Sequence, residues 1–192
     1  MEKMVSEYKI AKEIFSLGKD ILLSEEAGRM KKFTQHGTTT VFEHCVSVAK
    51  YSLIFAMNLE TLFGIKLDRR SLVRGALLHD YFLYDWHEKD NGAHRLHGFT
   101  HPGRAFENAA RDFDMNDKER DVIRKHMFPL TPVPPRFLES ALVCIADKWC
   151  ALCETFKVDI SSYIIYRVNM YRALASGDIK AIKGQAVASV EA

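Results

Sequence analysis

The sequence predicts an all-α protein built as a single-domain helical bundle. Apolar residues recur at intervals of three and four along most of its 192 residues, and alternating runs of β-branched residues are almost absent. The hydrophobic content of 47% is enough for one ordinary core, whereas the chain is too short for two full-sized domains and a linker. We therefore expect one domain over residues 1–192, with about seven helices.

Capping residues mark where the first helices begin and end. A helix at residues 3–23 is interrupted near Gly18, and a loop at residues 31–40 ends in threonines that suit the start of the next helix, residues 41–63. Gly64 ends that second helix. Asp68 is the expected N-cap of a third helix, which runs into the pair His79-Asp80.

The second half of the chain continues the helical pattern. Pro102 is expected at the first position of the fourth helix, directly after His101, because proline is favoured there. The segment between Pro129 and Pro135 holds four prolines and is not helical. The last four helices are expected at residues 102–113, 117–127, 136–156 and 161–175. Residues 81–100 lack the pattern, and an irregular segment of that length is typical of a lid or binding loop.

Charge and composition narrow the functional classes. The formal net charge is +2, from 27 basic and 25 acidic residues, so we expect no polymeric nucleic acid as partner. The sequence shows no signal peptide and no apolar run that could span a membrane, which predicts a cytoplasmic protein. The four cysteines, including the pair Cys150 and Cys153, are expected to be buried thiols in a reducing compartment.

One aspartate lies where a plain helical core would carry an apolar residue. Asp147 occurs inside the run from Ala141 to Leu152, and its neighbours three and four positions away are small and largely apolar. Burying a carboxylate costs several kcal/mol unless a cation or strong hydrogen-bond donors offset the lost hydration. Asp147 is therefore a candidate metal ligand.

Histidines and a second aspartate occupy comparable positions. His79-Asp80 follows an apolar run at a helix end, and His44 lies on the apolar stripe of the second helix. His126 falls in the last turn of the fifth helix, and His101 precedes Pro102. Any one of these histidines is more often a hydrogen-bonded core residue. The six together carry the imidazole and carboxylate ligands that divalent metals prefer, and they are His44, His79, Asp80, His101, His126 and Asp147.

The order and spacing of these six residues resemble the HD-domain superfamily of metal-dependent phosphohydrolases, in the variant with two additional histidines. The resemblance covers residues 36–156, where the metal-site core is expected, with the helices at residues 3–23 and 161–175 packing on it. The phrases Gln35-His36-Gly37 and His97-Gly98-Phe99-Thr100-His101-Pro102 are also similar to a small bacterial branch of that superfamily.

The resemblance implies two divalent metal ions. His44, His79, Asp80 and Asp147 would hold the first ion, and Asp80 would bridge to a second ion completed by His101 and His126. Such a pair generates a hydroxide and neutralises charge during displacement at phosphorus. The metal itself is left open among iron, manganese, nickel, cobalt, zinc and magnesium.

Three residues are expected to serve in catalysis: Asp80 as the bridging ligand, and Lys148 and Arg104 as binders of phosphate oxygens. A solvated surface charge is the alternative for each cation. His97 could replace His101 as a ligand, and His36 could line the site or cap the second helix. The other candidates are aromatic residues that could stack on a base or simply pack, and loop histidines without an assigned role: Tyr81, Tyr84, Trp86, Trp149, His87 and His94.

The resemblance implies hydrolysis of a phosphate ester or anhydride in a nucleotide or other small phosphorylated metabolite. The segment Tyr81-Phe82-Leu83-Tyr84 lacks the lysine of the cyclic-dinucleotide branch and the acidic pair of the alarmone hydrolases, which disfavours both substrates. Two alternatives remain: a di-iron oxygenase on the same scaffold, and a non-catalytic metal- or ligand-binding regulatory module.

Overall fold

The computed structural model describes residues 2–84 and 97–177, which form a mostly helical single domain. These residues contain nine α-helices, a 3-10 turn and a two-stranded antiparallel hairpin. The elements in chain order are α1 (Glu2–Leu17), α2 (Lys19–Leu22), α3 (Glu25–Arg29), η1 (Met30–Lys32), β1 (Thr34–His36), β2 (Thr39–Thr40), α4 (Val41–Phe63), α5 (Arg69–Leu78), α6 (His97–Asp112), α7 (Asp117–Lys125), α8 (Leu138–Thr155) and α9 (Ser162–Ser176).

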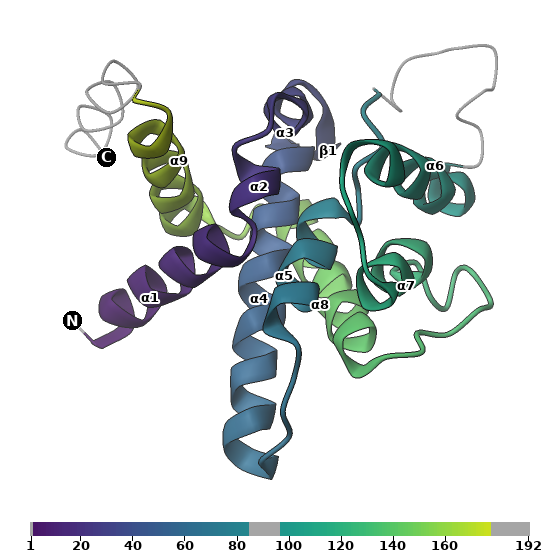
Figure 1. Cartoon of the computed structure of the whole chain (residues 1–192), viewed down its shortest axis with the longest axis horizontal. Helices are drawn as coiled ribbons and strands as arrows, with labels where there is room; N and C mark the ends of the chain where they lie inside the picture. The colour runs from purple at the N-terminus through teal and green to yellow at the C-terminus, as the bar shows by residue number, and fades with distance from the viewer. Residues whose placement is uncertain (1, 85–96, 178–192) are drawn as a thin grey trace.

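The long helix α4 lies in the middle of the molecule, with α5 and α8 packed along it (Figure 1). Helices α1 and α9 lie on one side of α4, and α6 and α7 on the other. Helix α7 contacts both α5 and α8, so these four helices enclose the main core. Core side chains from α4 and α5 such as Val48, Leu53 and Leu72 are fully buried. No helix in the described ranges is long and apolar enough to cross a bilayer.

The prediction of a helical fold is confirmed, and α4 begins and ends where the sequence predicts. Thr40 and Glu43 form a capping box, in which each side chain bonds the other residue's backbone N–H. At the other end Gly64 adopts φ 66°, the left-handed conformation that glycine tolerates best. Asp68 caps α5 as predicted, by accepting a hydrogen bond from the Ser71 backbone N–H.

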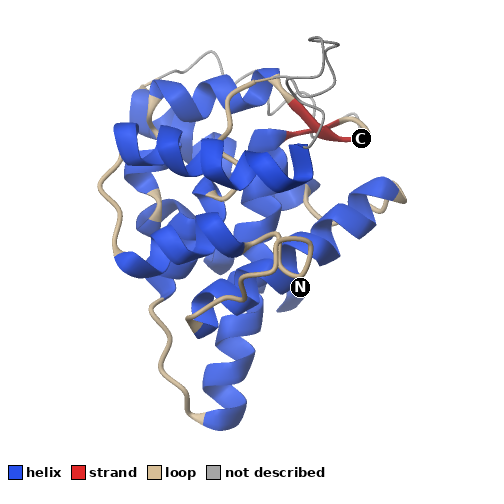
Figure 2. Cartoon of the chain, turned by 90° about the vertical axis from the view of Figure 1, so that its right-hand side faces the viewer, coloured by secondary structure: helices blue, strands red, loops and turns tan. Residues whose placement is uncertain are grey.

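The N-terminal region is more divided than the sequence indicates. The first helix breaks at Gly18, where a Cβ atom would lie only 2.3 Å from Leu77 Cδ1, so the chain needs glycine to approach α5. Beyond it Ser24 caps the short helix α3, which the pattern did not predict. Residues 34–40, expected to be a loop, pair as the hairpin β1–β2 at the end of the bundle where α4 begins (Figure 2).

The predicted start of the fourth helix is wrong. Helix α6 begins at His97, so His101 and Pro102 lie inside it. Pro102 lacks the N–H that would bond the Gly98 carbonyl. The helix loses only this one hydrogen bond, because the N–H groups before it in the first turn have no partner within the helix. His101 therefore projects from the second turn of a helix and not from the residue before it.

Candidate metal centre

All six predicted ligand residues meet in the middle of the bundle. Helix α4 carries His44, the end of α5 carries His79 and Asp80, and α6, the end of α7 and α8 carry one residue each. Their exposed fractions lie between 0% and 7%, so none of them faces bulk solvent. The three residues not yet named are His101 on α6, His126 at the end of α7 and Asp147 on α8.

Three of these residues form one cluster. Asp147 Oδ1 lies 3.1 Å from His44 Nε2 and 3.6 Å from His79 Nε2. The ligand atoms of the three side chains all lie within 4.8 Å of one another. One carboxylate and two imidazoles at this spacing can contact a single cation.

The other three residues form a second cluster. Asp80 Oδ1 lies 3.2 Å from His101 Nε2 and 3.4 Å from His126 Nε2. The two Nε2 atoms are themselves only 2.8 Å apart. These three side chains also satisfy the distance limit for ligands of one ion.

Asp80 connects the two clusters. While Oδ1 faces His101 and His126, Oδ2 lies 3.4 Å from His79 Nε2 and 3.8 Å from His44 Nε2. One carboxylate therefore presents one oxygen to each cluster. This is the arrangement of a carboxylate shared by two cations.

Hydrogen bonds on the far side of three rings orient the imidazoles. His79 Nδ1 lies 2.8 Å from the Ala76 carbonyl oxygen and His126 Nδ1 lies 2.9 Å from the Ile123 carbonyl oxygen. A carbonyl only accepts, so Nδ1 carries a proton in both rings, and Nε2 is the atom that faces the cluster and is available to a cation. His44 Nδ1 lies 2.8 Å from Glu154 Oε2 in the same way. Ligand imidazoles in metal sites are held by such partners.

In the absence of a cation, protons would balance the charge inside the site. Burial alone would lower the pKa of His44, but hydrogen bonds to Asp147 and Glu154 raise it to about 10. Burial would likewise raise the pKa of Asp147, yet its hydrogen bond to His44 and the nearby His79 imidazole hold that pKa well below the usual range. Both pKa shifts have the same cause, because the buried carboxylates of Asp147 and Glu154 are stabilised by positive charge on the neighbouring imidazoles.

The donor set fits two divalent cations. His79 Nε2 and Asp80 Oδ1 are buried and have no hydrogen-bond partner among the described residues, although both are oriented into the clusters. Leaving such atoms unpaired costs about 1–3 kcal/mol each. A cation at each cluster would satisfy them, and the mixture of imidazole and carboxylate suits iron, manganese, cobalt, nickel or zinc.

A cavity of about 640 Å³ opens onto the second cluster and Asp147. Apart from the ligands, its polar lining residues in the described chain are Gln35 and Lys148. Lys148 Nζ donates to the His126 carbonyl oxygen at 2.6 Å and lies 3.4 Å from Asp147 Oδ2. The rest of the lining is Gly98, Met127, Pro129, Leu130 and Ala151. The lining of the cavity therefore combines charged and polar residues beside the metal-ligand clusters with mainly apolar residues elsewhere.

Other residues singled out in the sequence lie elsewhere. Arg104 places its guanidinium 4.9 Å from the centre of the Tyr84 ring and is not among the described residues that line the cavity. Tyr81 is fully buried, donates to Asp112 Oδ2 and packs against Phe113, so stacking on a ligand is excluded for it. Outside the described residues lie the segment 85–96, with Trp86, His87 and His94, and the side chains of His36 and His97.

Two functional contacts escaped the sequence interpretation. Gln35 Nε2 donates to Asp80 Oδ2 at 2.6 Å, and Glu154 holds His44. Glu154 could have been found, because it follows Asp147 by seven residues and so lies on the same face of α8. Gln35 could not, because only the fold of the β1–β2 hairpin brings it to Asp80.

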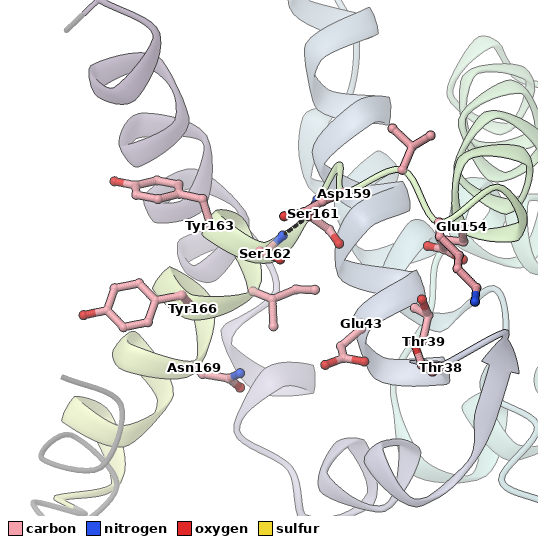
Figure 3. A pocket seen from close by; sticks show the side chains of 13 residues that line it. Thr38, Thr39, Glu43, Glu154, Asp159, Ser161, Ser162, Tyr163, Tyr166 and Asn169 are labelled. Carbon is pink, nitrogen blue, oxygen red and sulfur yellow. Dashed lines mark hydrogen bonds between the residues drawn. The ribbon is translucent and has the colours of Figure 1, made fainter. Parts of the chain in front are cut away.

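A second cavity, about 980 Å³, also reaches Glu154. Figure 3 shows Glu43 and Glu154 on one side of it and Tyr166 and Asn169 of α9 on the other. It shares no described lining residue with the first cavity. The two spaces are therefore separate approaches to the helix that carries Asp147.

Comparison with known proteins agrees with this geometry. Residues 41–152 match the family described as HD domain. The dihydroneopterin 2',3'-cyclic phosphate phosphodiesterase of Methanocaldococcus jannaschii is 29% identical over 113 residues, which cover 56% of this chain and 45% of that protein. The chain thus spans less than half the length of this curated relative. No solved structure matches the chain.

Proposed function

We propose that this chain, which belongs to the HD-domain family of metal-dependent phosphohydrolases, cleaves a phosphate ester or anhydride of a nucleotide or another small phosphorylated metabolite at a dinuclear site. One observation carries the proposal: the Asp80 carboxylate lies between two buried clusters and presents an oxygen to each.

In this proposal each cluster holds one divalent ion. His44, His79 and Asp147 would hold the first, His101 and His126 would hold the second, and Asp80 would contribute to both. When bound, such a pair of ions supplies Lewis acidity and lowers the pKa of coordinated water. Glu154 and Gln35 keep their ligand partners in position, since a ligand without such support is bound less tightly.

Lys148 is the protein's own contact for the substrate phosphate. Its ammonium lies at the cavity, bonded to the His126 carbonyl oxygen and 3.4 Å from Asp147 Oδ2 of the first cluster. Phosphate oxygens attract a compact positive charge, and the apolar wall around it reduces competition from water. Arg104, stacked on Tyr84, remains a predicted second contact.

The cavity favours a substrate with an apolar, flat portion beside its phosphate. Its volume of about 640 Å³ is in the usual range for small-molecule sites, and Met127, Pro129 and Leu130 provide an apolar surface. The similar archaeal protein is named for a pterin 2',3'-cyclic phosphate. Cyclic phosphodiesters on heterocyclic nucleosides or pterins are therefore the first substrates to test.

The test is turnover by the purified protein loaded in turn with each candidate metal. The panel contains 2',3'-cyclic phosphates, mononucleotides, dinucleoside polyphosphates and p-nitrophenyl phosphate esters. We expect hydrolysis of at least one class, and none by the His79→Gln/Asp80→Asn double variant. Equal turnover by that variant would disprove the proposal. Iron-dependent oxygen consumption without hydrolysis would identify an oxygenase, and a protein that binds no metal would identify a regulatory module.

Lys148→Ala tests the substrate contact. We expect kcat/KM to fall by about 10- to 100-fold with bound metal unchanged, because a hydrogen bond to a charged group contributes about 1.5–3 kcal/mol. The exposed Lys66→Ala is the matched control and should leave kcat/KM unchanged. If Lys148→Ala behaves like Lys66→Ala, Lys148 does not bind phosphate.

A further inference from the structure

Helix α8 carries an apolar stripe on the face turned away from the metal centre. Four large apolar side chains on this face are exposed, and Phe156 at the C-cap continues the row with 72% of its surface exposed. Single exposed apolar residues are ordinary, but a continuous row marks a contact surface. The α8 seam consists of Leu138, Ile145, Trp149, Leu152 and Phe156, which are exposed by 42%, 58%, 47%, 52% and 72%.

The outer face of α8 lacks the charges that normally keep a helix in water. All of α8 lies in the described chain, and its exposed residues outside the seam are Lys148 and Thr155. Lys148 bonds the His126 carbonyl at the cavity, so it does not screen the seam. A helix that is apolar on both faces is typical of a helix covered on both faces.

The spacing of the seam identifies what covers it. With Leu142, which is 6% exposed at its inner edge, the apolar positions are separated by four, three, four, three and four residues. This is the spacing of the apolar positions in a two-helix coiled coil. The intervals read the same in both directions, so an antiparallel second copy of α8 would place each of these six positions opposite another, with Leu152 of one copy over the edge of the largely buried Leu142 of the other. The pairs are Leu138 with the partner's Phe156, Leu142 with the partner's Leu152, and Ile145 with the partner's Trp149.

We infer that the chain forms a two-fold homodimer through antiparallel contact of the α8 seams. The five exposed side chains offer roughly 500 Å² per copy, taking about 150–250 Å² for a whole large apolar side chain. Two copies thus bury roughly 1,000 Å², the lower size limit for a specific interface. An isologous interface requires such a self-complementary patch.

The first experiment measures association of the full chain by sedimentation velocity over a range of concentrations. The wild-type protein should dimerise, and Trp149→Glu should raise the dissociation constant at least about 30-fold, as for a central aromatic anchor. Leu62→Glu is the matched control, because Leu62 is 74% exposed at the end of α4 and outside the seam. Circular dichroism of each variant shows whether it is folded.

Three outcomes overturn the inference. A wild-type protein that stays monomeric at all concentrations would mean that another part of the same chain covers the seam or that nothing does. A folded Trp149→Glu variant that dimerises like the wild type would place the interface elsewhere. Equal weakening by Leu62→Glu would show a nonspecific effect of added charge.

A second experiment tests the antiparallel register by disulfide cross-linking. A mixture of Ile145→Cys and Trp149→Cys proteins should cross-link under mild oxidation, because these positions face each other. A mixture of Leu138→Cys and Trp149→Cys should not, since their offset along the helices is about 10 Å. The four native cysteines are buried, and the wild-type protein gives the background. Efficient cross-linking of Ile145→Cys with itself alone would show a parallel pair and overturn the proposed dimer.

Discussion

At the scale of single residues, the orientation of His44 depends on Glu154. The Glu154 carboxylate accepts a hydrogen bond from His44 Nδ1 and is itself 7% exposed. Its other oxygen, Oε1, is buried without a hydrogen-bond partner among the described residues. Keeping this carboxylate buried is costly, which indicates that its contact with His44 has a function.

Glu154→Gln should weaken metal binding. An amide accepts a weaker hydrogen bond than a carboxylate, and loss of an outer partner typically costs 10- to 100-fold in metal affinity. Isothermal titration calorimetry, in which metal is added to chelator-treated protein, measures the metal affinity. The exposed Glu107→Gln on α6 is the control. Unchanged affinity in Glu154→Gln would mean that Glu154 does not support His44.

The stability of the metal-free protein should depend on His44 through pH. Burial would lower the pKa of His44, but its bonds to Asp147 and Glu154 raise it from 6.5 to about 10. A pKa raised by folding gives stability that is fully present below pH 6.5 and lost as pH rises through 10. In urea denaturation with chelator, the free energy of unfolding should decrease over this interval.

The control for this pH dependence is His44→Gln, which has no titrating ring. Its free energy of unfolding should decrease less over the same pH interval. If the free energy of unfolding decreases equally with pH in the two proteins, the titration of His44 does not cause the decrease.

Single residues also show how far sequence reasoning reaches. Asp147 and His44 were identifiable because a polar residue on an apolar helical stripe needs a partner, and the sequence shows both the residue and the stripe. Gln35 was not, because its contact with Asp80 bridges 45 positions and follows from tertiary packing. For Tyr81 the sequence left two alternatives, stacking on a base or packing, because an aromatic side chain looks the same in a core and in a binding site; the structure shows packing.

At the scale of elements, the contact between α5 and α7 places His79 against His126. The two helices approach so closely at Gly75 that a Cβ atom there would lie 2.9 Å from Val122 Cβ and Cγ2. Both residues are buried, so neither helix can move away freely. The ring centroids of His79 and His126 are 4.9 Å apart as a result.

Gly75→Ala should destabilise the protein by up to about 2 kcal/mol. Alanine favours a helix over glycine by about 1 kcal/mol, but overpacking a core costs about 1–3 kcal/mol and strains two ligand-bearing helices. Gly103→Ala in α6 is the matched control, because a Cβ atom there meets nothing within 4 Å and should stabilise by about 0.5–1 kcal/mol. Urea denaturation of both variants measures the difference. A stabilised Gly75→Ala would show that α7 adjusts freely.

The ends of a helix could be predicted where the capping residue and its hydrogen-bond partner are close in the sequence. Thr40, Gly64 and Asp68 determine their helix ends through neighbours in sequence. The start of α6 was not predictable, because Pro102 permits a helix to begin either at it or a turn before it. Gly98, whose Cβ would lie 3.0 Å from Leu130 Cδ2, shows that packing on the distant 129–135 segment takes part in that start.

At the scale of the whole molecule, the six ligand residues come from five helices. The chain between His44 and Asp147 folds so that α4, α5, α6, α7 and α8 all end or pass at the clusters. Cations bound there would connect all five helices. Metal bound at these clusters would therefore couple to global stability.

Metal removal should lower the melting temperature. A ligand at 100 times its dissociation constant stabilises the folded state by about 2.7 kcal/mol, which corresponds to about 5–10 °C for a chain of this size. Differential scanning calorimetry with and without chelator measures the shift. The His79→Gln/Asp80→Asn variant should show no shift, and a shift of equal size in that variant would place the metal elsewhere.

The adjacency of His79 and Asp80 has a final consequence. His79 belongs to the first cluster and Asp80 presents an oxygen to each, so a single planar peptide unit connects the residues that would hold two ions. Ions of different radius would then be accommodated by rotation of the histidine side chains on α4, α6 and α7, because a side chain rotates more easily than a planar peptide unit is distorted. Exchange of one metal for another should thus alter the positions of the His44, His101 and His126 rings before it alters the junction after α5.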